Sequence, residues 1–136
     1  MREIEFRGKD RTGIMYNDWF YGSLDLTTNE EYPRIICKDK FNNVMFIDVN
    51  KDTVGQYIGK KDRNGIKIFD GDILEYEFED IGKQKAYVKW NGKYSLFTLE
   101  VISEDFEYAP IELGVVIGNI YDNSELLKEN KLWWKE

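Results

Sequence analysis

The sequence contains no histidine, and this absence excludes several kinds of active site together. Histidine is the usual general base near neutral pH and the commonest metal ligand in proteins. The serine–histidine and cysteine–histidine pairs of hydrolases are excluded for the same reason. The chain also has no phosphate-binding loop, dinucleotide-binding fingerprint, nucleophile elbow or zinc-ligand spacing. We therefore expect a protein that is not an enzyme and that holds no cofactor or metal.

Cysteine is almost as scarce, because Cys37 is the single cysteine of the chain. One cysteine cannot form a disulfide within the chain, which is typical of proteins from a reducing compartment. We expect Cys37 to be a small buried apolar side chain, since no histidine is available to lower its pKa. Apolar runs are only a few residues long, whereas a membrane helix needs about 20. The first residues show no signal-peptide pattern, so we expect a cytoplasmic protein with no membrane partner.

Arginine is absent after Arg63, and acidic residues outnumber lysines in the second half of the chain. The net charge is −7. Nucleic-acid phosphates are bound by clustered basic residues, so this charge argues against general nucleic-acid affinity. Hydrophobic residues make up 42% and aromatic residues 15% of the 136 residues, which is too apolar for a disordered chain.

Short apolar segments separated by turn residues are abundant, a pattern typical of small β-sandwiches and barrels. The predicted strands are Glu3–Arg7, Trp19–Leu26, Arg34–Cys37, Val44–Val49, Ile73–Glu79, Ala86–Trp90, Lys93–Leu99 and Val115–Tyr121. We expect a mainly β fold with a small SH3-like barrel in the second half, packed with additional N-terminal strands. Asn123 is a favourable helix N-cap and Glu125 adds an acid to the first turn, so one short C-terminal helix is expected.

The expected organisation is an N-terminal β region over residues 1–50 and a barrel region with the helix over residues 51–136. One continuous domain over residues 1–136 is the alternative. The segment richest in turn-forming residues lies near this boundary, between Thr53 and Leu74. Asn64-Gly65 is the strongest short-range hairpin signal. Asp70-Gly71-Asp72 predicts either a turn in which a carboxylate accepts backbone N–H groups or a site for Mg²⁺ or Ca²⁺.

The strand Ile73–Glu79 alternates between an apolar face and a face of glutamates. Like charges on one face repel unless the next strand opposes them. A loop over Asp80–Gly82, with its glycine in the left-handed conformation, predicts such a strand. This register places Glu79 opposite Lys83, Glu77 opposite Lys85, Phe78 opposite Gln84, Tyr76 opposite Ala86 and Leu74 opposite Val88. A paired strand face is therefore favoured over a set of acid–base carboxylates.

The Asn64-Gly65 hairpin carries a basic cluster, which we call the basic tip. It consists of Lys60, Lys61, Arg63 and Lys67, with Tyr57 nearby. Either this tip is solvated, or it contacts nucleic acid through phosphates and base stacking. Gln56 lies between apolar neighbours and is interpreted either as an amide that bonds an adjacent backbone or as a ligand-recognition residue.

Trp133 and Trp134 are a second candidate binding surface. Adjacent tryptophans point in different directions, so one is exposed unless a partner covers it. The alternative is that the terminal helix folds back and buries both rings. An exposed ring would suit a protein partner or a homo-oligomer.

Several segments, in a fixed order, resemble a known family. They are Arg2–Lys9, Phe20–Gly22, Val54–Tyr57, Asp62–Gly65, Gly71–Ile73 and Ile117–Asn123. In these segments the chain resembles the YopX family of small bacteriophage and prophage proteins. Ser124 and Lys60 depart from the pattern, at turn or cap positions where the family often has proline and leucine. The resemblance implies a mainly β fold with an SH3-like barrel and a phage or prophage source, but no activity and no catalytic residues.

Three functional hypotheses follow. The leading one is a non-enzymatic phage or prophage accessory protein whose β module binds a protein partner or assembles with itself. The second is a nucleic-acid-binding SH3-like barrel that uses the basic tip at residues 60–67. The last is a metal-dependent enzyme built on Asp70 and Asp72.

Overall fold

The computed structural model describes residues 2–11, 18–27, 31–103, 106 and 108–128. The chain forms two compact units, Met1–Gly59 and Lys60–Glu136, which are considered separately. The division expected between residues 50 and 51 stays a prediction, because it concerns which part of the chain folds on its own. No helix in the described ranges has the length and apolar character needed to cross a membrane.

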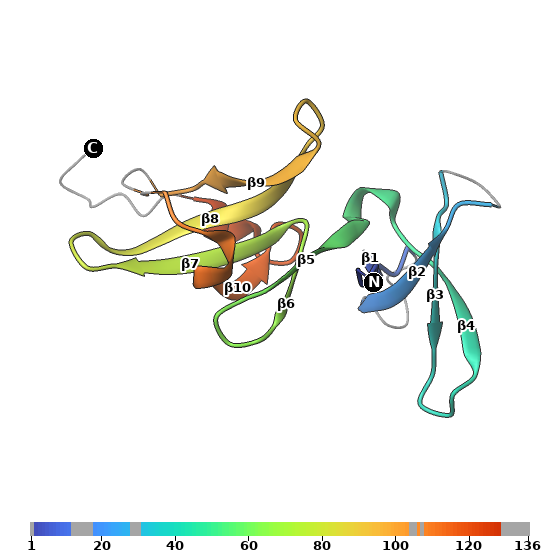
Figure 1. The fold of residues 1–136 in the computed structure, drawn as a ribbon. Helices are drawn as coiled ribbons and strands as arrows, with labels where there is room; N and C mark the ends of the chain where they lie inside the picture. The colour runs from blue at the N-terminus through green and yellow to red at the C-terminus, as the bar shows by residue number, and fades with distance from the viewer. Residues whose placement is uncertain (1, 12–17, 28–30, 104–105, 107, 129–136) are drawn as a thin grey trace. The chain divides into compact units, whose positions relative to one another are not determined.

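The first unit is an antiparallel sheet with the strand order β4-β3-β2-β1-β5 (Figure 1). Its strands are β1 (Phe6–Lys9), β2 (Trp19–Asp25), β3 (Arg34–Lys38), β4 (Val44–Asp48) and the first part of β5 (Gly55–Lys61). The sequence prediction is confirmed for β2, β3 and β4 to within one residue. It is wrong for β1, which begins at Phe6 and not at Glu3. Phe6 is the first residue of β1 with strand partners, Gly22 on one side and Gln56 on the other.

The core of this unit contains Ile35, Val49 and Tyr57, all buried. The buried carboxylate of Asp25 fastens the end of β2 to the start of β3. It accepts hydrogen bonds from the Thr27 hydroxyl and from Nη2 of Arg34, each at 2.6 Å. The bonds from Thr27, followed by the bond from the Arg34 guanidinium, lower the pKa of Asp25 to about 2.

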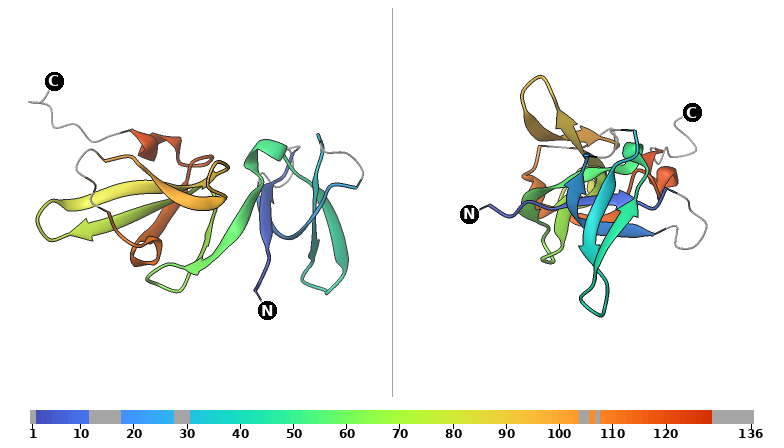
Figure 2. Two further views of the ribbon diagram at one scale, coloured as in Figure 1. Left: turned by 45° about the horizontal axis from the view of Figure 1, so that its top comes forward. Right: turned by 90° about the vertical axis from the view of Figure 1, so that its right-hand side faces the viewer.

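The second unit contains an antiparallel sheet with the order β10-β7-β8-β9 (Figure 2). The strands of this sheet are β7 (Asp72–Phe78), β8 (Gly82–Asn91), β9 (Leu96–Val101) and β10 (Val115–Asn119). The unit also contains β6 (Lys67–Phe69), which is the neighbour of β5 and is not part of this sheet. The mainly β prediction is confirmed, and β7, β8 and β9 pair as neighbours in chain order. The SH3-like barrel is not confirmed, because the sheet of the described residues has two edges, β10 and β9, and does not close.

The predicted register between β7 and β8 is wrong by two residues. Glu77 lies opposite Lys83, Glu75 opposite Lys85, Tyr76 opposite Gln84, Leu74 opposite Ala86 and Phe78 opposite Gly82. Gly82 does have a positive φ of 75°, but it is the first residue of β8 and not the last residue of the loop. A slip of two residues returns every side chain to its own face, so charge and hydrophobicity support both registers equally.

The turn between β8 and β9 is longer than the two residues that separate the predicted strands Ala86–Trp90 and Lys93–Leu99. Oδ1 of Asn91 accepts the backbone N–H groups of Lys93 and Tyr94, at 3.0 and 3.2 Å. Ser95 then takes a positive φ of 54°. These bonds hold residues 92–95 in the turn, so β9 begins at Leu96 and not at Lys93.

The predicted C-terminal helix is also not confirmed, because Ser124–Leu127 forms a single 3-10 turn. Asn123 makes no capping bond to this turn. Its Oδ1 instead accepts the backbone N–H of Asn119 at 3.1 Å, which folds the side chain back onto the end of β10. The side chain of Asn123, which the sequence predicts to cap a helix, therefore bonds the loop that precedes the 3-10 turn.

Candidate functional site

The basic tip is built on Asp62, a residue that the sequence analysis did not single out. Its carboxylate is only 6% exposed. Oδ1 accepts the N–H groups of Asn64 and Ile66 at 2.8 and 2.9 Å, and Oδ2 accepts the N–H of Val116 at 2.9 Å. Burial raises the pKa of Asp62, but these three N–H donors outweigh it and leave the pKa below its ordinary value. Asp62 therefore ties the hairpin to β10 as a carboxylate.

The basic residues of the tip do not form a free cationic patch. Lys60 pairs with Glu112 at 3.5 Å between Nζ and Oε2, and both side chains are about half exposed. The N–H of Glu112 itself, followed by the charge of Lys60, lowers the pKa of Glu112 against the effect of burial. Lys61 and Arg63 are exposed, whereas Lys67 is half-buried. Two cations of the cluster are thus presented to solvent without a described ion pair.

The other predicted site residues lie elsewhere. Gln56 and Tyr57 belong to the first unit, where Gln56 is half-buried opposite Phe6. Tyr57 is 7% exposed, so its ring is not available for stacking on a base. Trp133 and Trp134 lie outside the described residues.

The Asp70-Gly71-Asp72 turn has the geometry expected for a backbone-capping carboxylate. Oδ2 of the buried Asp72 accepts the N–H of Phe69 at 2.7 Å, and Gly71 has a positive φ of 94°. Within the described ranges, His, Cys, Asp and Glu residues form no group of three that could hold a metal ion. The lone thiol, Cys37, is half-buried, and burial raises its pKa, which lowers its thiolate fraction.

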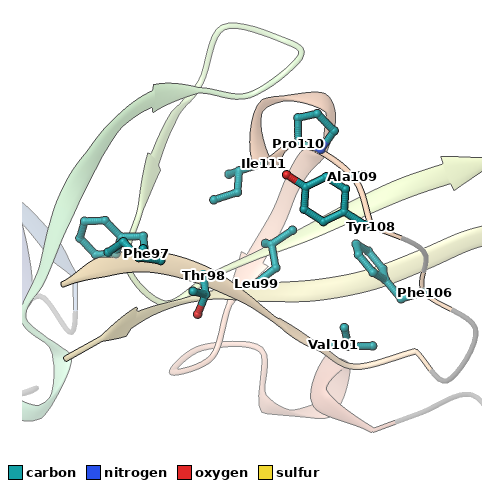
Figure 3. A pocket seen from close by; sticks show the side chains of 10 residues that line it. Phe97, Thr98, Leu99, Val101, Phe106, Tyr108, Ala109, Pro110 and Ile111 are labelled. Carbon is teal, nitrogen blue, oxygen red and sulfur yellow. The ribbon is translucent and has the colours of Figure 1, made fainter. Parts of the chain in front are cut away.

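An apolar groove of about 520 Å³ lies beside the edge strand β9, in the second unit. Figure 3 shows side chains of β9 along one side and side chains of a segment that follows β9 along the other. The lining residues are Leu96, Phe97, Thr98, Leu99, Val101, Phe106, Tyr108, Ala109, Pro110 and Ile111. Thr98 and Tyr108 supply the polar side chains of this set, so the groove is suited to apolar groups.

Aromatic packing holds the second wall of the groove over the sheet. The Phe106 ring meets the Tyr76 and Phe78 rings edge to face, with centroids 5.1 and 5.4 Å apart. The buried Tyr76 hydroxyl donates to the carbonyl of Ile111 at 2.9 Å. The wall is thus anchored at both ends by residues of β7.

The groove presents large apolar groups to solvent. Tyr108 is 95% exposed and Val101 is 54% exposed. Exposed aromatic and aliphatic side chains gathered beside a concave surface are a feature of interaction sites. The sequence-based expectations do not include this groove, because they assign no strand or motif between Leu99 and Val115. The available signal was the apolar character of Phe106, Tyr108 and Pro110 in this interval.

Comparisons with known proteins show a fold that is shared with a solved structure and, separately, the family of the chain. The structure is similar to the crystal structure of protein EF1440 from Enterococcus faecalis, with a TM-score of 0.56 and 20% sequence identity. The likeness covers 94% of this chain and 100% of that chain, and it shows a shared fold. A comparison with curated proteins gave no match. The model of the family described as YopX protein matches residues 5–128, and the chain therefore belongs to the YopX family.

Proposed function

We propose that this protein is a non-enzymatic phage or prophage accessory protein that binds an extended, apolar segment of another protein in the groove beside β9. It acts in the cytoplasm of the bacterial host. The observation that carries the proposal is the groove itself, a concave apolar surface of about 520 Å³ with exposed aromatic groups. This volume lies within the range of about 300–1,000 Å³ that is usual for binding sites.

The position of the groove at a sheet edge favours a peptide over a compact small molecule. β9 is the last strand of its sheet, so one side of its backbone has no neighbouring strand among the described residues. An extended peptide can add to such an edge through main-chain hydrogen bonds while alternate side chains enter a pocket. Phe97, Leu99 and Val101 alternate along β9 and all line the groove. A segment with bulky apolar residues at alternate positions is the complementary ligand.

The chemistry of the lining favours binding over catalysis. Among the lining residues there is no carboxylate, amine or thiol, and the hydroxyls of Thr98 and Tyr108 have no adjacent general base within this set. General acid–base and nucleophilic catalysis both require such a group within hydrogen-bonding distance of the substrate.

Selection from a random-peptide display library tests this function. We expect the selected peptides to carry aromatic or large aliphatic residues at alternate positions. The variant Val101→Asp should weaken their binding at least about tenfold, because it places a charge in an apolar site. Val44→Asp is a matched control, since Val44 lies on the edge strand β4 of the other unit and is 57% exposed, against 54% for Val101. No selection of apolar peptides, or equal losses in both variants, would contradict the proposal.

Nucleic-acid binding through the basic tip is the alternative, favoured by the exposure of Lys61 and Arg63. If it is correct, the double variant Lys61→Ala/Arg63→Ala should abolish a gel shift with short single- or double-stranded DNA at low salt, because about two phosphate contacts are lost. The matched control is Lys83→Ala/Lys93→Ala, which removes two exposed lysines, one at the start of β8 and one in the β8–β9 turn. The absence of any shift at low salt would rule this function out.

A further inference from the structure

We propose that one face of the sheet in the first unit binds single-stranded nucleic acid, with bases stacked on its rings and phosphates beside its lysines. We call this surface the ring face, and its defining residues are Trp19, Tyr21, Arg34, Ile36, Lys38 and Phe46. The first unit contains neither the apolar groove nor the basic tip, so this site is independent of the proposed function.

The strand register places the rings on one face of the sheet (Figure 1). Ser23 lies opposite Ile36, and Ile36 lies opposite Phe46. Tyr21 and Trp19 follow from Ser23 at steps of two residues along β2. Residues that are directly opposite, or two apart on one strand, share a face. From the usual spacings of strands and residues, Tyr21 and Phe46 lie about 12 Å apart, which is far enough to hold two different bases.

The ring face is solvated and yet rich in apolar groups. Tyr21 is 45%, Val44 57% and Phe46 53% exposed, whereas Ile35, which points to the opposite face, is fully buried. A sheet with one solvated face normally carries polar side chains on that face. Rings and aliphatic groups in these positions therefore indicate an interaction surface.

Arg34 adds a planar cation to this surface. Its guanidinium carbon lies 4.8 Å from the centroid of the Phe46 ring. Nε and Nη2 donate to Oδ2 of the buried Asp25, at 3.1 and 2.6 Å, which fixes the plane of the group. Bases stack on guanidinium planes as well as on rings. Because the plane is already held in place, little side-chain freedom is lost when a ligand binds.

A second pair of the same kind lies on the ring face. The guanidinium of Arg7 is 4.6 Å from the centroid of Trp19, and Arg7 is buried, so it supports the indole from within the protein. Proteins contain about one strong cation–π pair per 70–80 residues. Two such pairs on one small sheet exceed that frequency, and both present a planar group at the surface.

The charge of the ring face is opposite to that of a phosphate backbone. Within β1 to β4 this face holds four cations and two carboxylates, namely Arg7, Lys9, Arg34 and Lys38 against Asp25 and Asp48. The chain as a whole has a net charge of −7. Salt screens charges that are more than about 8–10 Å apart, so the local excess of cations decides what this face attracts.

These features favour a single strand over a duplex or an apolar protein. The bases of a duplex are stacked on one another, whereas an unpaired base can lie flat on a ring. An apolar protein surface would cover the rings and leave the lysines at the border of the face without phosphates or carboxylates to bind. Since every base has a π face, we expect binding with little dependence on sequence.

Fluorescence anisotropy with the full chain tests the proposal. The probes are labelled oligo-dT and oligo-U of about 12 nucleotides and a DNA duplex of the same length. We expect at least one single strand to bind, and the duplex to bind at least about tenfold more weakly, because its bases are not free to stack. A preference for oligo-dT would identify the ligand as DNA and a preference for oligo-U as RNA. No binding of either single strand at low salt, or equal binding of the duplex, would overturn the proposal.

The rings are tested one at a time. Phe46→Ala and Tyr21→Ala should each weaken binding about fivefold or more, since each removes a stacking surface. Phe46→Trp keeps a ring and should retain the affinity. Tyr94→Ala is the matched control, because Tyr94 is a 64% exposed ring in the turn between β8 and β9 of the other unit. Circular dichroism checks the fold of each variant, and losses as large in Tyr94→Ala as in Phe46→Ala would overturn the proposal.

Salt dependence tests the lysines separately from the rings. Two phosphate contacts, at Lys9 and Lys38, predict a slope of about −1.4 for the logarithm of the binding constant against the logarithm of the salt concentration. Lys38→Ala should reduce this slope by about 0.7, whereas Phe46→Ala should leave it unchanged. An unchanged slope in Lys38→Ala would contradict the assigned phosphate contact.

Two other results would assign the observations elsewhere. If Lys61→Ala/Arg63→Ala abolishes binding and the ring variants do not weaken it, the nucleic acid binds at the basic tip and the proposal fails. If neither single strand binds and sedimentation shows a dimer that Phe46→Ala converts to a monomer, the ring face joins two copies of the chain and the proposal fails. Val101→Asp in the apolar groove should leave nucleic-acid binding unchanged, which keeps this test separate from the peptide-binding function.

Discussion

Replacement of Asp62 by alanine is expected to lower the free energy of unfolding by about 3 kcal/mol or more, because three backbone N–H groups lose their acceptor and each loss costs about 1–3 kcal/mol. These donors belong to Asn64, Ile66 and Val116, so the change weakens both the hairpin and its attachment to β10. Urea unfolding followed by circular dichroism measures the loss. Asp80→Ala is the matched control, since Asp80 is exposed in the β7–β8 turn. Equal stability of the two variants would contradict this role for Asp62.

The same carboxylate makes stability depend on pH with a defined sign. The pKa of Asp62 in the folded protein is lower than its ordinary value of 3.8. A group with a lowered folded pKa stabilises the protein fully above its unfolded pKa, and this contribution is lost as the pH falls through the folded pKa. The difference in stability between the unmodified protein and Asp62→Asn should therefore be largest at neutral pH and shrink below pH 3.8. A difference that grows on acidification would contradict the assignment.

Gly22→Ala is expected to be similarly damaging to the first unit, at about 3 kcal/mol or more, because the added methyl group meets backbone and not a movable side chain. A Cβ at Gly22 would clash with the carbonyl oxygen of Ile36 on β3 and would lie 3.3 Å from Cβ of Cys37. The β2 and β3 strands would have to separate to accept it. Urea unfolding compared with the unmodified protein measures the cost.

Gly92→Ala is the control for the Gly22→Ala variant. A Cβ there would have its nearest contact at 3.9 Å, from Nε1 of Trp90, which is ordinary packing distance. Removing glycine from the unfolded chain stabilises a protein by about 0.4–1 kcal/mol when the site accepts the new group. Gly92→Ala should therefore be neutral or slightly stabilising. A Gly22→Ala variant as stable as Gly92→Ala would show that the strands accommodate the methyl group without cost.

The β7–β8 hairpin illustrates how far sequence patterns reach. Alternation predicted that both strands exist, which side chains share a face, and that lysines oppose the glutamates of β7. It could not distinguish pairings that differ by two residues, since the side-chain period of a strand is also two. In the structure Gly82 begins β8 opposite Phe78, which selects one of these pairings. Nζ of Lys83 lies 3.8 Å from Oε1 of its diagonal neighbour Glu75.

Asn123 and Asn91 show a second limit of sequence-based prediction, which is the choice of hydrogen-bond partner by a polar side chain. Each has the side chain that local rules expect at a helix cap or a tight hairpin. Each instead accepts a hydrogen bond from a backbone N–H of its own loop. Asn123 bonds Asn119 and is followed by a 3-10 turn in place of the expected helix. Asn91 bonds Lys93, and β9 begins only at Leu96. A short polar side chain has several backbone partners within reach, and the surrounding fold selects among them.

Sequence pattern was sufficient for the fold class and most strands, because alternation and turn chemistry act between residues that are close along the chain. The family followed from the resemblance of several segments and is shown by the family model. The role of Asp62 and the groove required the folded structure. Asp62 acts through Val116, which is 54 residues away, and the groove joins β9 to a wall held by Tyr76 and Phe78 of β7. Neither arrangement has a local signal, because each depends on which distant segments the sheet brings side by side.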